Sequence, residues 1–231
     1  MNSRIFIVAE KLKEEYKDFN HKNKVNPLDE LIFIICSIKR SESRYLLAFQ
    51  DLKRAFPSHQ SLSEASLSRI KRVLAPYGLQ NEKALAIKEL LRSIIKAFGK
   101  PTLSPLRKMG DRECEAFLLS LRGVGRKVAR CVMMYSLGRA VFPVDSNCWR
   151  LCHRLGWIHW RHKVDVISSK DMDLLQAMMP EQLRASLHLN MVFHGRNVCT
   201  VRNPKCCICI IEKHCPRIFG HNVGTRQYKS G

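Results

Sequence analysis

Apolar residues recur three and four positions apart along nearly the whole chain, and this spacing restricts what the chain can fold into. The clearest run lies in residues 87–98, where the apolar positions are Ile87, Leu90, Leu91, Ile94, Ile95 and Phe98. Side chains with this spacing share one face of an α-helix, whereas a half-buried strand needs strict alternation. The sequence has no convincing alternating segment and no internal repeat, so it predicts an all-α fold.

Shorter stripes and turn signals predict further helices. Leu28, Leu31, Ile32 and Ile35 are apolar at helical spacing, and the apolar residues Phe33 and Ile34 between them indicate a buried central helix. Ser61 and Glu64 have the spacing of a capping box at a helix start. A helix is predicted over about residues 126–137, and Gly138 is the expected stop because glycine readily adopts the left-handed conformation that ends helices.

The chain is strongly basic, with 40 Lys and Arg against 20 Asp and Glu and a formal net charge of +20. Such an excess favours a polyanionic partner, nucleic acid first, with a membrane surface or an acidic protein as alternatives. The longest apolar run, Leu31 to Cys36, is far shorter than the ~20 residues of a membrane span. Glu10, Glu14 and Glu15 interrupt any secretory pattern, so we expect a reducing compartment, in which ten cysteines indicate metal ligation or burial.

Four cysteines near the C-terminus have the spacing C-x6-C-x2-C-x5-C, and they are Cys199, Cys206, Cys209 and Cys215. Four thiolates within 17 residues can surround one compact centre, either a [4Fe–4S] cluster or a zinc ion. Zinc sites usually pair two C-x2-C steps, and only one such step occurs here, so the spacing favours iron and sulfur. Cys207 breaks the spacing and is left out of the predicted site.

A turn with two glycines, Leu121-Arg-Gly-Val-Gly-Arg-Lys127, joins two predicted helices. Gly123 and Gly125 let the backbone approach a ligand closely, and the unpaired N–H groups that begin the next helix can bind an anion such as a DNA phosphate. A lone turn of this kind is more often an ordinary connection between helices. The basic side chains that we expect to contact DNA around this turn are Arg122, Arg126 and Arg130.

Lys127 lies in the first turn of the helix that follows. The helix dipole and the neighbouring Arg126 disfavour a protonated amine there, and a neutral amine is what Schiff-base chemistry requires. A lysine alone is more often a solvated surface residue. Eighteen residues further on, Asp145 falls at the start of the helix that carries Cys148. Asp145 is either an N-cap or a carboxylate that serves Lys127 by accepting a proton or stabilising a cationic sugar.

These three features, in this order, resemble the helix–hairpin–helix DNA glycosylases, specifically the endonuclease III family. That family places a hairpin L-P-G-V-G-x-K first, then V-D, then a four-cysteine iron–sulfur loop. The likeness covers roughly residues 25–216. It implies a six-helix barrel domain over about residues 25–140. It also implies a second domain that combines residues 1–24 with residues 141–231 and holds a [4Fe–4S] cluster on the four cysteines.

By match of position, the resemblance makes Lys127 the nucleophile at the sugar C1′ and Asp145 the catalytic carboxylate. It implies a combined glycosylase and AP lyase that excises a damaged or modified base, a pyrimidine being favoured, and then cuts the strand by β-elimination. The partner is double-stranded DNA with such a base or an abasic site, and the target nucleotide is flipped out. A monofunctional (mismatch) glycosylase and a non-catalytic DNA-binding module are the alternatives. We expect a monomer, located in the cytoplasm with the nucleoid in a bacterium or in the nucleus in a eukaryote.

The chain departs from the family pattern at several positions. Arg122 replaces the hairpin proline, and Lys39 stands where a glutamine usually fills the gap left by the flipped base. Leu79 matches a residue that wedges into the duplex, and Asn147 stands where the bacterial pattern has histidine. Residues 142–147 also resemble the plant 5-methylcytosine glycosylases. These departures leave the identity of the excised base open.

Overall fold

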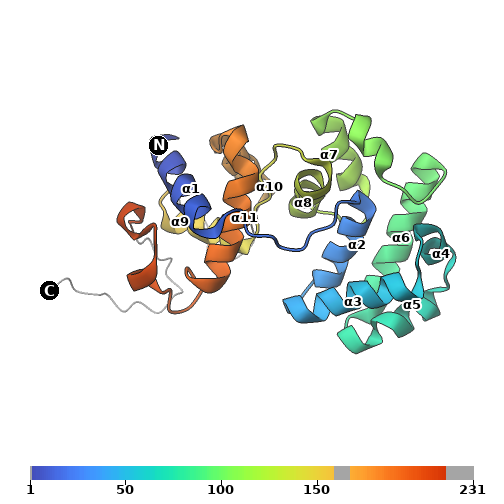
Figure 1. The fold of residues 1–231 in the computed structure, drawn as a ribbon. Helices are drawn as coiled ribbons and strands as arrows, with labels where there is room; N and C mark the ends of the chain where they lie inside the picture. Colours follow the sequence, from blue (N-terminus) through green and yellow to red (C-terminus); the bar gives the residue numbers. More distant parts are fainter. Residues whose placement is uncertain (1, 159–166, 217–231) are drawn as a thin grey trace. The chain divides into compact units, whose positions relative to one another are not determined.

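A computed structural model describes residues 2–158 and 167–216, and all regular structure within these ranges is helical (Figure 1). This confirms the all-α prediction. The chain divides into two compact units, one formed by Lys22–Arg139 and the other by Met1–His21 together with Ala140–Gly231. Within the described ranges, no helix combines the length and the apolar character that a membrane crossing requires.

The unit Lys22–Arg139 is built around one buried helix. Its elements are α2 (Pro27–Ser37), α3 (Glu42–Ala55), α4 (His59–Glu64), α5 (Leu67–Leu74), η1 (Ala75–Tyr77), α6 (Gln80–Phe98), η2 (Ser104–Lys108), α7 (Asp111–Ser120) and α8 (Arg126–Leu137). Helix α2 packs against α3, α6 and α8 and buries nine of its 11 residues. It is the predicted central helix, and its apolar residues on all sides are explained by neighbours on several faces.

Two local predictions in this unit had different outcomes. Helix α8 has the predicted bounds, and Gly138 ends it in the left-handed conformation with φ 66°. The predicted capping box of Ser61 and Glu64 was wrong, because the box belongs to the helix that begins at His59. There the backbone N–H of Ser61 donates to Oγ of Ser58 at 3.0 Å, and the backbone N–H of Ser58 donates to Oγ of Ser61 at 3.2 Å.

The other unit combines the two ends of the chain. Its elements are α1 (Asn2–Tyr16), α9 (Ser146–Arg154), α10 (Ser169–Met178), α11 (Glu181–Asn197), η3 (Cys206–Ile208) and η4 (Glu212–His214). Helix α11 packs against both α1 and α9. Buried Leu12 of α1, Leu151 of α9 and Met191 of α11 belong to one hydrophobic cluster, which also contains Phe142. The N-terminal helix is therefore part of the core that supports residues 199–215, the cysteine-rich segment.

Candidate functional site

The hairpin between α7 and α8 leaves the start of α8 open. Gly123 has φ 80°, a left-handed conformation that glycine adopts without strain, and the N–H of Val124 closes the turn on the carbonyl of Leu121 at 3.0 Å. Gly125 is the N-cap of α8 and has no side chain with which to cap it. The first N–H groups of α8 can therefore serve an external acceptor, and the helix dipole favours an anion there.

The three arginines around the hairpin lie in different surroundings. Arg122 is exposed, and its Nη1 donates to Oε1 of Glu89 at 2.7 Å. Arg126 is half-buried in the first turn of α8. The side chain of Arg130 is only 2% exposed, and its Nε donates to Oε1 of Glu115 at 2.8 Å. The sequence led us to expect a phosphate contact for Arg130. The side chain is buried instead, because Glu115 on α7 forms an ion pair with it.

Lys127 is half-buried in the first turn of α8, which packs against α2. Helix α2 contributes Glu30, which is fully buried and accepts hydrogen bonds from Nδ2 of Asn23 at 2.5 Å and from the backbone N–H of Lys24 at 2.7 Å. Burial raises the pKa of Glu30, while these two hydrogen bonds and then the charges of Lys24 and Lys127 oppose the rise. Glu30 could not be predicted as a site residue, because an acidic pair, Asp29 and Glu30, within an apolar stretch forms no motif.

Asp145 is the N-cap of α9, so the structural interpretation of this residue is confirmed. Its Oδ1 accepts the backbone N–H groups of Asn147 at 2.9 Å and Cys148 at 2.8 Å. Its Oδ2 accepts Nδ2 of the Asn147 side chain at 2.9 Å. These contacts hold the half-buried carboxylate in one orientation, which a catalytic role would also need.

Asn147 and Arg150 connect Asp145 to the cysteine-rich segment. Nη2 of Arg150 donates to Oδ1 of Asn147 at 2.9 Å and to the carbonyl of Gly195 at 2.7 Å, and its Nε donates to the carbonyl of Cys199 at 2.9 Å. Gly195 is required where α11 passes this network, since a Cβ at that position would lie 2.7 Å from Cβ of Asn147. A continuous set of hydrogen bonds therefore runs from the Asp145 carboxylate to the backbone of Cys199.

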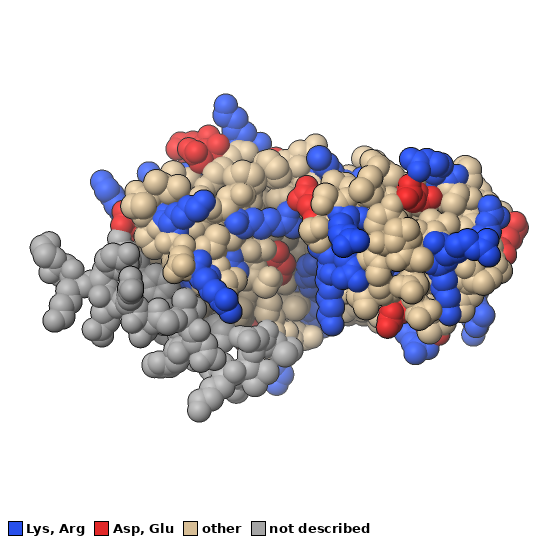
Figure 2. All heavy atoms as spheres, turned by 90° about the horizontal axis from the view of Figure 1, so that it is seen from below, with Lys and Arg blue, Asp and Glu red and all other residues tan. Residues whose placement is uncertain are grey.

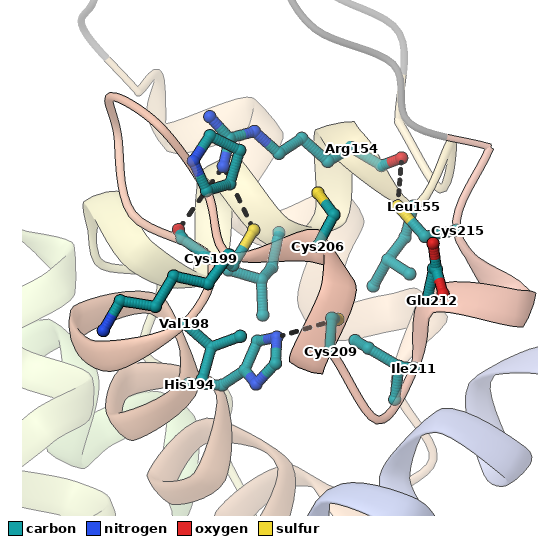
Figure 3. Close-up of a pocket in the computed structure, with 13 residues that line it drawn as sticks. Arg154, Leu155, His194, Val198, Cys199, Cys206, Cys209, Ile211, Glu212 and Cys215 are labelled. Atoms are coloured by element: carbon teal, nitrogen blue, oxygen red, sulfur yellow. Dashed lines mark hydrogen bonds between the residues drawn. The ribbon is translucent and has the colours of Figure 1, made fainter. Parts of the chain in front are cut away.

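The four predicted cysteines line one pocket (Figure 3), and they are Cys199, Cys206, Cys209 and Cys215. Nη1 of Arg154 lies 3.1 Å from the sulfur of Cys199, and Nε2 of His194 lies 3.5 Å from the sulfur of Cys209. Cys207, which was left out of the predicted site, is exposed and does not line the pocket. Four thiols with nitrogen donors beside them are a donor set that fits an iron–sulfur cluster.

The ring of His194 is itself held in place. His194 is fully buried, and its Nδ1 lies 2.7 Å from the hydroxyl of Tyr16 on α1. Burial, and then the charge of Arg150, lowers the pKa of His194 to about 4, so the ring is neutral at pH 7. A Tyr16 hydroxyl that donates to Nδ1 leaves the proton on Nε2, which then points to the Cys209 sulfur.

No local pattern marks Arg154, His194 or Tyr16 as neighbours of the cysteines, and nothing in the sequence links residue 16 to residue 194. Within residues 2–158 and 167–216, no three His, Cys, Asp or Glu side chains are gathered closely enough to hold a single metal ion. A four-iron cluster does not need its ligands gathered around one metal ion, because each of its irons takes its own thiolate.

Lys39 and Leu79, the two predicted gap-filling residues, share an uncommon backbone conformation. Lys39 has φ 52° and Leu79 has φ 55°, and both lie in the unit Lys22–Arg139 with the hairpin and Lys127. Asp145, Asn147 and the four cysteines belong to the other unit. On the face shown in Figure 2, Lys and Arg side chains cover more of the surface than Asp and Glu do, in line with the net charge of +20.

Comparison with known proteins identifies the class of fold. The structure is similar to that of a trapped endonuclease III–DNA covalent intermediate, with a TM-score of 0.80, 21% identity and coverage of 94% of this chain and 96% of that one. It is also similar to a thermostable thymine-DNA glycosylase, with a TM-score of 0.77, 21% identity and coverage of 94% and 97%. At such identities the likeness establishes the fold alone.

Sequence comparison establishes the family. The family model described as HhH-GPD superfamily base excision DNA repair protein matches residues 32–176. The chain therefore belongs to this superfamily of DNA glycosylases. It is 27% identical over 211 residues to endonuclease III of Thermotoga maritima, covering 90% of this chain and 92% of that protein. It is 28% identical over 170 residues to the transcriptional activator DEMETER of Arabidopsis thaliana, covering 68% of this chain and 9% of that much longer protein.

The contact at Gly195 generates a stability prediction. Alanine normally stabilises a helix interior relative to glycine by up to about 1 kcal/mol. Here we expect Gly195→Ala to lower the free energy of unfolding by about 1–3 kcal/mol, because the added methyl group displaces Asn147 from Asp145 and Arg150. Urea denaturation followed by circular dichroism measures this change. Gly110→Ala, at the N-cap of α7, is the control for a methyl group added where there is space, since a Cβ at Gly110 meets no atom within 4 Å. Equal effects of the two substitutions would contradict the account of this network.

Proposed function

We propose that this protein is a bifunctional DNA glycosylase and AP lyase that excises a damaged or modified pyrimidine and cleaves the strand by β-elimination. The observation that carries the proposal is Lys127, an amine in the first turn of the helix after a two-glycine hairpin, in a chain of the HhH-GPD superfamily. Similarity to endonuclease III over 90% of the chain supports it. A structural neighbour is described as a trapped covalent intermediate between endonuclease III and DNA.

In the proposed reaction, the neutral Nζ of Lys127 attacks C1′ of the deoxyribose, and the base departs with the electron pair of the glycosidic bond. Loss of a proton from nitrogen and opening of the sugar give an imine between lysine and C1′. The imine acidifies the C2′ proton, whose removal expels the 3′ phosphate. We assign Asp145 the carboxylate role, accepting a proton or stabilising the cationic sugar, because its hydrogen bonds fix it in one orientation.

The Lys127 amine belongs to the N-terminal turn of α8, and the buried Glu30 of α2 lies near enough for the lysine charge to act on its carboxyl group. An amine attacks in its neutral form, so the proposed cycle includes a general base that takes a proton from nitrogen.

We propose double-stranded DNA containing the target base or an abasic site as the partner, bound by a monomer. The open N–H groups of α8, with Gly123 and Gly125 allowing close approach, would bind a phosphate, and Arg122 and Arg126 would add favourable charge. Arg130 would support the hairpin from within through Glu115. Lys39, Leu79 and Asn147 would contact the gap left by the flipped nucleotide. Such a protein acts where DNA is, at the nucleoid or in the nucleus.

We propose a [4Fe–4S] cluster bound by Cys199, Cys206, Cys209 and Cys215. When bound, the cluster supplies metal–thiolate bonds that stabilise the fold of the cysteine-rich segment. Arg154 and His194 would donate hydrogen bonds to two of the thiolates. Through Arg150, this segment would also hold the side chains of Asn147 and Asp145 in position.

Borohydride trapping tests the catalytic proposal. On duplex DNA with an aldehydic abasic site, the wild-type protein should form a covalent adduct and nick the strand, and Lys127→Gln should do neither while still binding DNA. Asp145→Asn should also bind, but release a target base roughly 10²-fold more slowly. Lys108→Gln, at an exposed position on η2, controls for the lost charge.

The outcomes separate the alternatives. Base release without trapping indicates a monofunctional glycosylase, and DNA binding with neither indicates a non-catalytic module. Undiminished trapping by Lys127→Gln would show that another amine is the nucleophile.

Metal analysis tests the cluster. The anaerobically purified protein should be yellow-brown, absorb near ~400 nm and contain about four irons per chain. Cys206→Ala should reduce both the iron content and the soluble yield, because metal binding contributes to folding. Cys207→Ala removes an exposed neighbouring thiol and should leave both unchanged. One zinc and no iron per chain would contradict the assignment.

A further inference from the structure

Two neighbouring loops place a non-glycine residue in the left-handed conformation at their tips. Lys39 follows α2 and Leu79 precedes α6, with φ 52° and φ 55°. The left-handed region costs a residue with a Cβ about 1–2 kcal/mol. Such conformations persist where the surrounding contacts hold them.

Arg40 makes contacts that hold both tips. Its Nη1 donates to the carbonyl of Lys39 at 2.8 Å, and its Nε donates to the carbonyl of Tyr77 at the end of η1. The guanidinium also lies against Gly78, where a Cβ would collide with Nη2. One side chain therefore bonds the carbonyl of Lys39 in the first loop and the carbonyl of Tyr77, two residues before Leu79, in the second.

Two further contacts join helices that flank these loops. Lys83 of α6 is only 2% exposed, and its Nζ donates to the carbonyl of Cys36 at 2.7 Å. That carbonyl lies in the last turn of α2, where carbonyls lack partners within the helix. Nη2 of Arg44 on α3 donates to the carbonyl of Pro76 at 3.0 Å. The elements that flank the two loops are therefore joined as well, by Arg44 at the surface and by Lys83 in the interior.

We propose that Arg40 is a positioning residue that joins Lys39 and Leu79 into one preformed wedge for the gap left by a flipped nucleotide, with Lys83 supporting the wedge from below. The inference rests on the proposed function. Because both loops are ordered before DNA arrives, little of the ordering cost falls on the binding step. Arg40 acts through the two tip residues, since the hydrogen bonds that define its position are to backbone carbonyls of the protein.

The affinity ratio between a damaged and an undamaged duplex tests this role. The probe is a duplex with one tetrahydrofuran abasic analogue, compared with the unmodified duplex of the same sequence. We expect Arg40→Met to lower the wild-type preference for the analogue about three- to tenfold, the scale of ordering one or two side chains at an interface. Arg72→Met, an exposed arginine of α5 with the same loss of charge, should leave the preference unchanged.

A double-mutant cycle separates positioning from general destabilisation. In the background of the paired substitutions Lys39→Ala and Leu79→Ala, Arg40→Met should change the preference by less than about twofold, because both side chains that it positions are already absent. Equal losses in both backgrounds, or equal preferences for Arg40→Met and Arg72→Met, would overturn the inference. A wild-type protein that shows no preference for the analogue overturns it as well.

Failure of the inference is distinguishable from failure of the proposed function. Borohydride trapping of the wild-type protein on an aldehydic abasic site reports on Lys127 and does not depend on the affinity ratio. Trapping together with an unchanged ratio in Arg40→Met rejects the positioning role alone. Absence of trapping rejects the lyase.

Discussion

The first N–H groups of an α-helix need acceptors, and the helices that carry Lys127 and Asp145 meet this need in opposite ways. Helix α9 is capped from within, since the Asp145 carboxylate accepts two of its N–H groups. Helix α8 follows Gly125, an N-cap residue that has no side chain with which to cap it, so its N-terminus remains open to an external anion. One helix start therefore orients a carboxylate, and the other is suited to a phosphate and presents an amine beside it.

The capped helix start also explains how the cysteine-rich segment relates to the site. Asp145 is bonded to Asn147, Asn147 to Arg150, and Arg150 to the carbonyl of Cys199. Gly195 allows α11 to pass close enough for these bonds to form. A cluster bound to the cysteines would therefore act on the carboxylate through geometry, by fixing the backbone on which Arg150 depends.

The sequence predicted those features that depend on neighbours along the chain. The helical spacing predicted an all-α fold, and Gly138 predicted the end of α8. Features that depend on contacts between distant segments were missed or predicted differently. Arg130 followed a glycine turn and suggested a phosphate contact, yet Glu115 on the preceding helix draws it inside. Tyr16 reaches His194 only because α1 and α11 pack together, and no local pattern encodes that packing.

The central claim is that the Lys127 amine becomes covalently joined to the sugar, and peptide mapping tests it most directly. The borohydride-reduced protein–DNA adduct would be digested with protease and nuclease, and the modified peptide sequenced by tandem mass spectrometry. The account predicts one modified residue, Lys127, carrying the mass of the reduced sugar remnant. A remnant on any other lysine, or on the N-terminal amine, would contradict it.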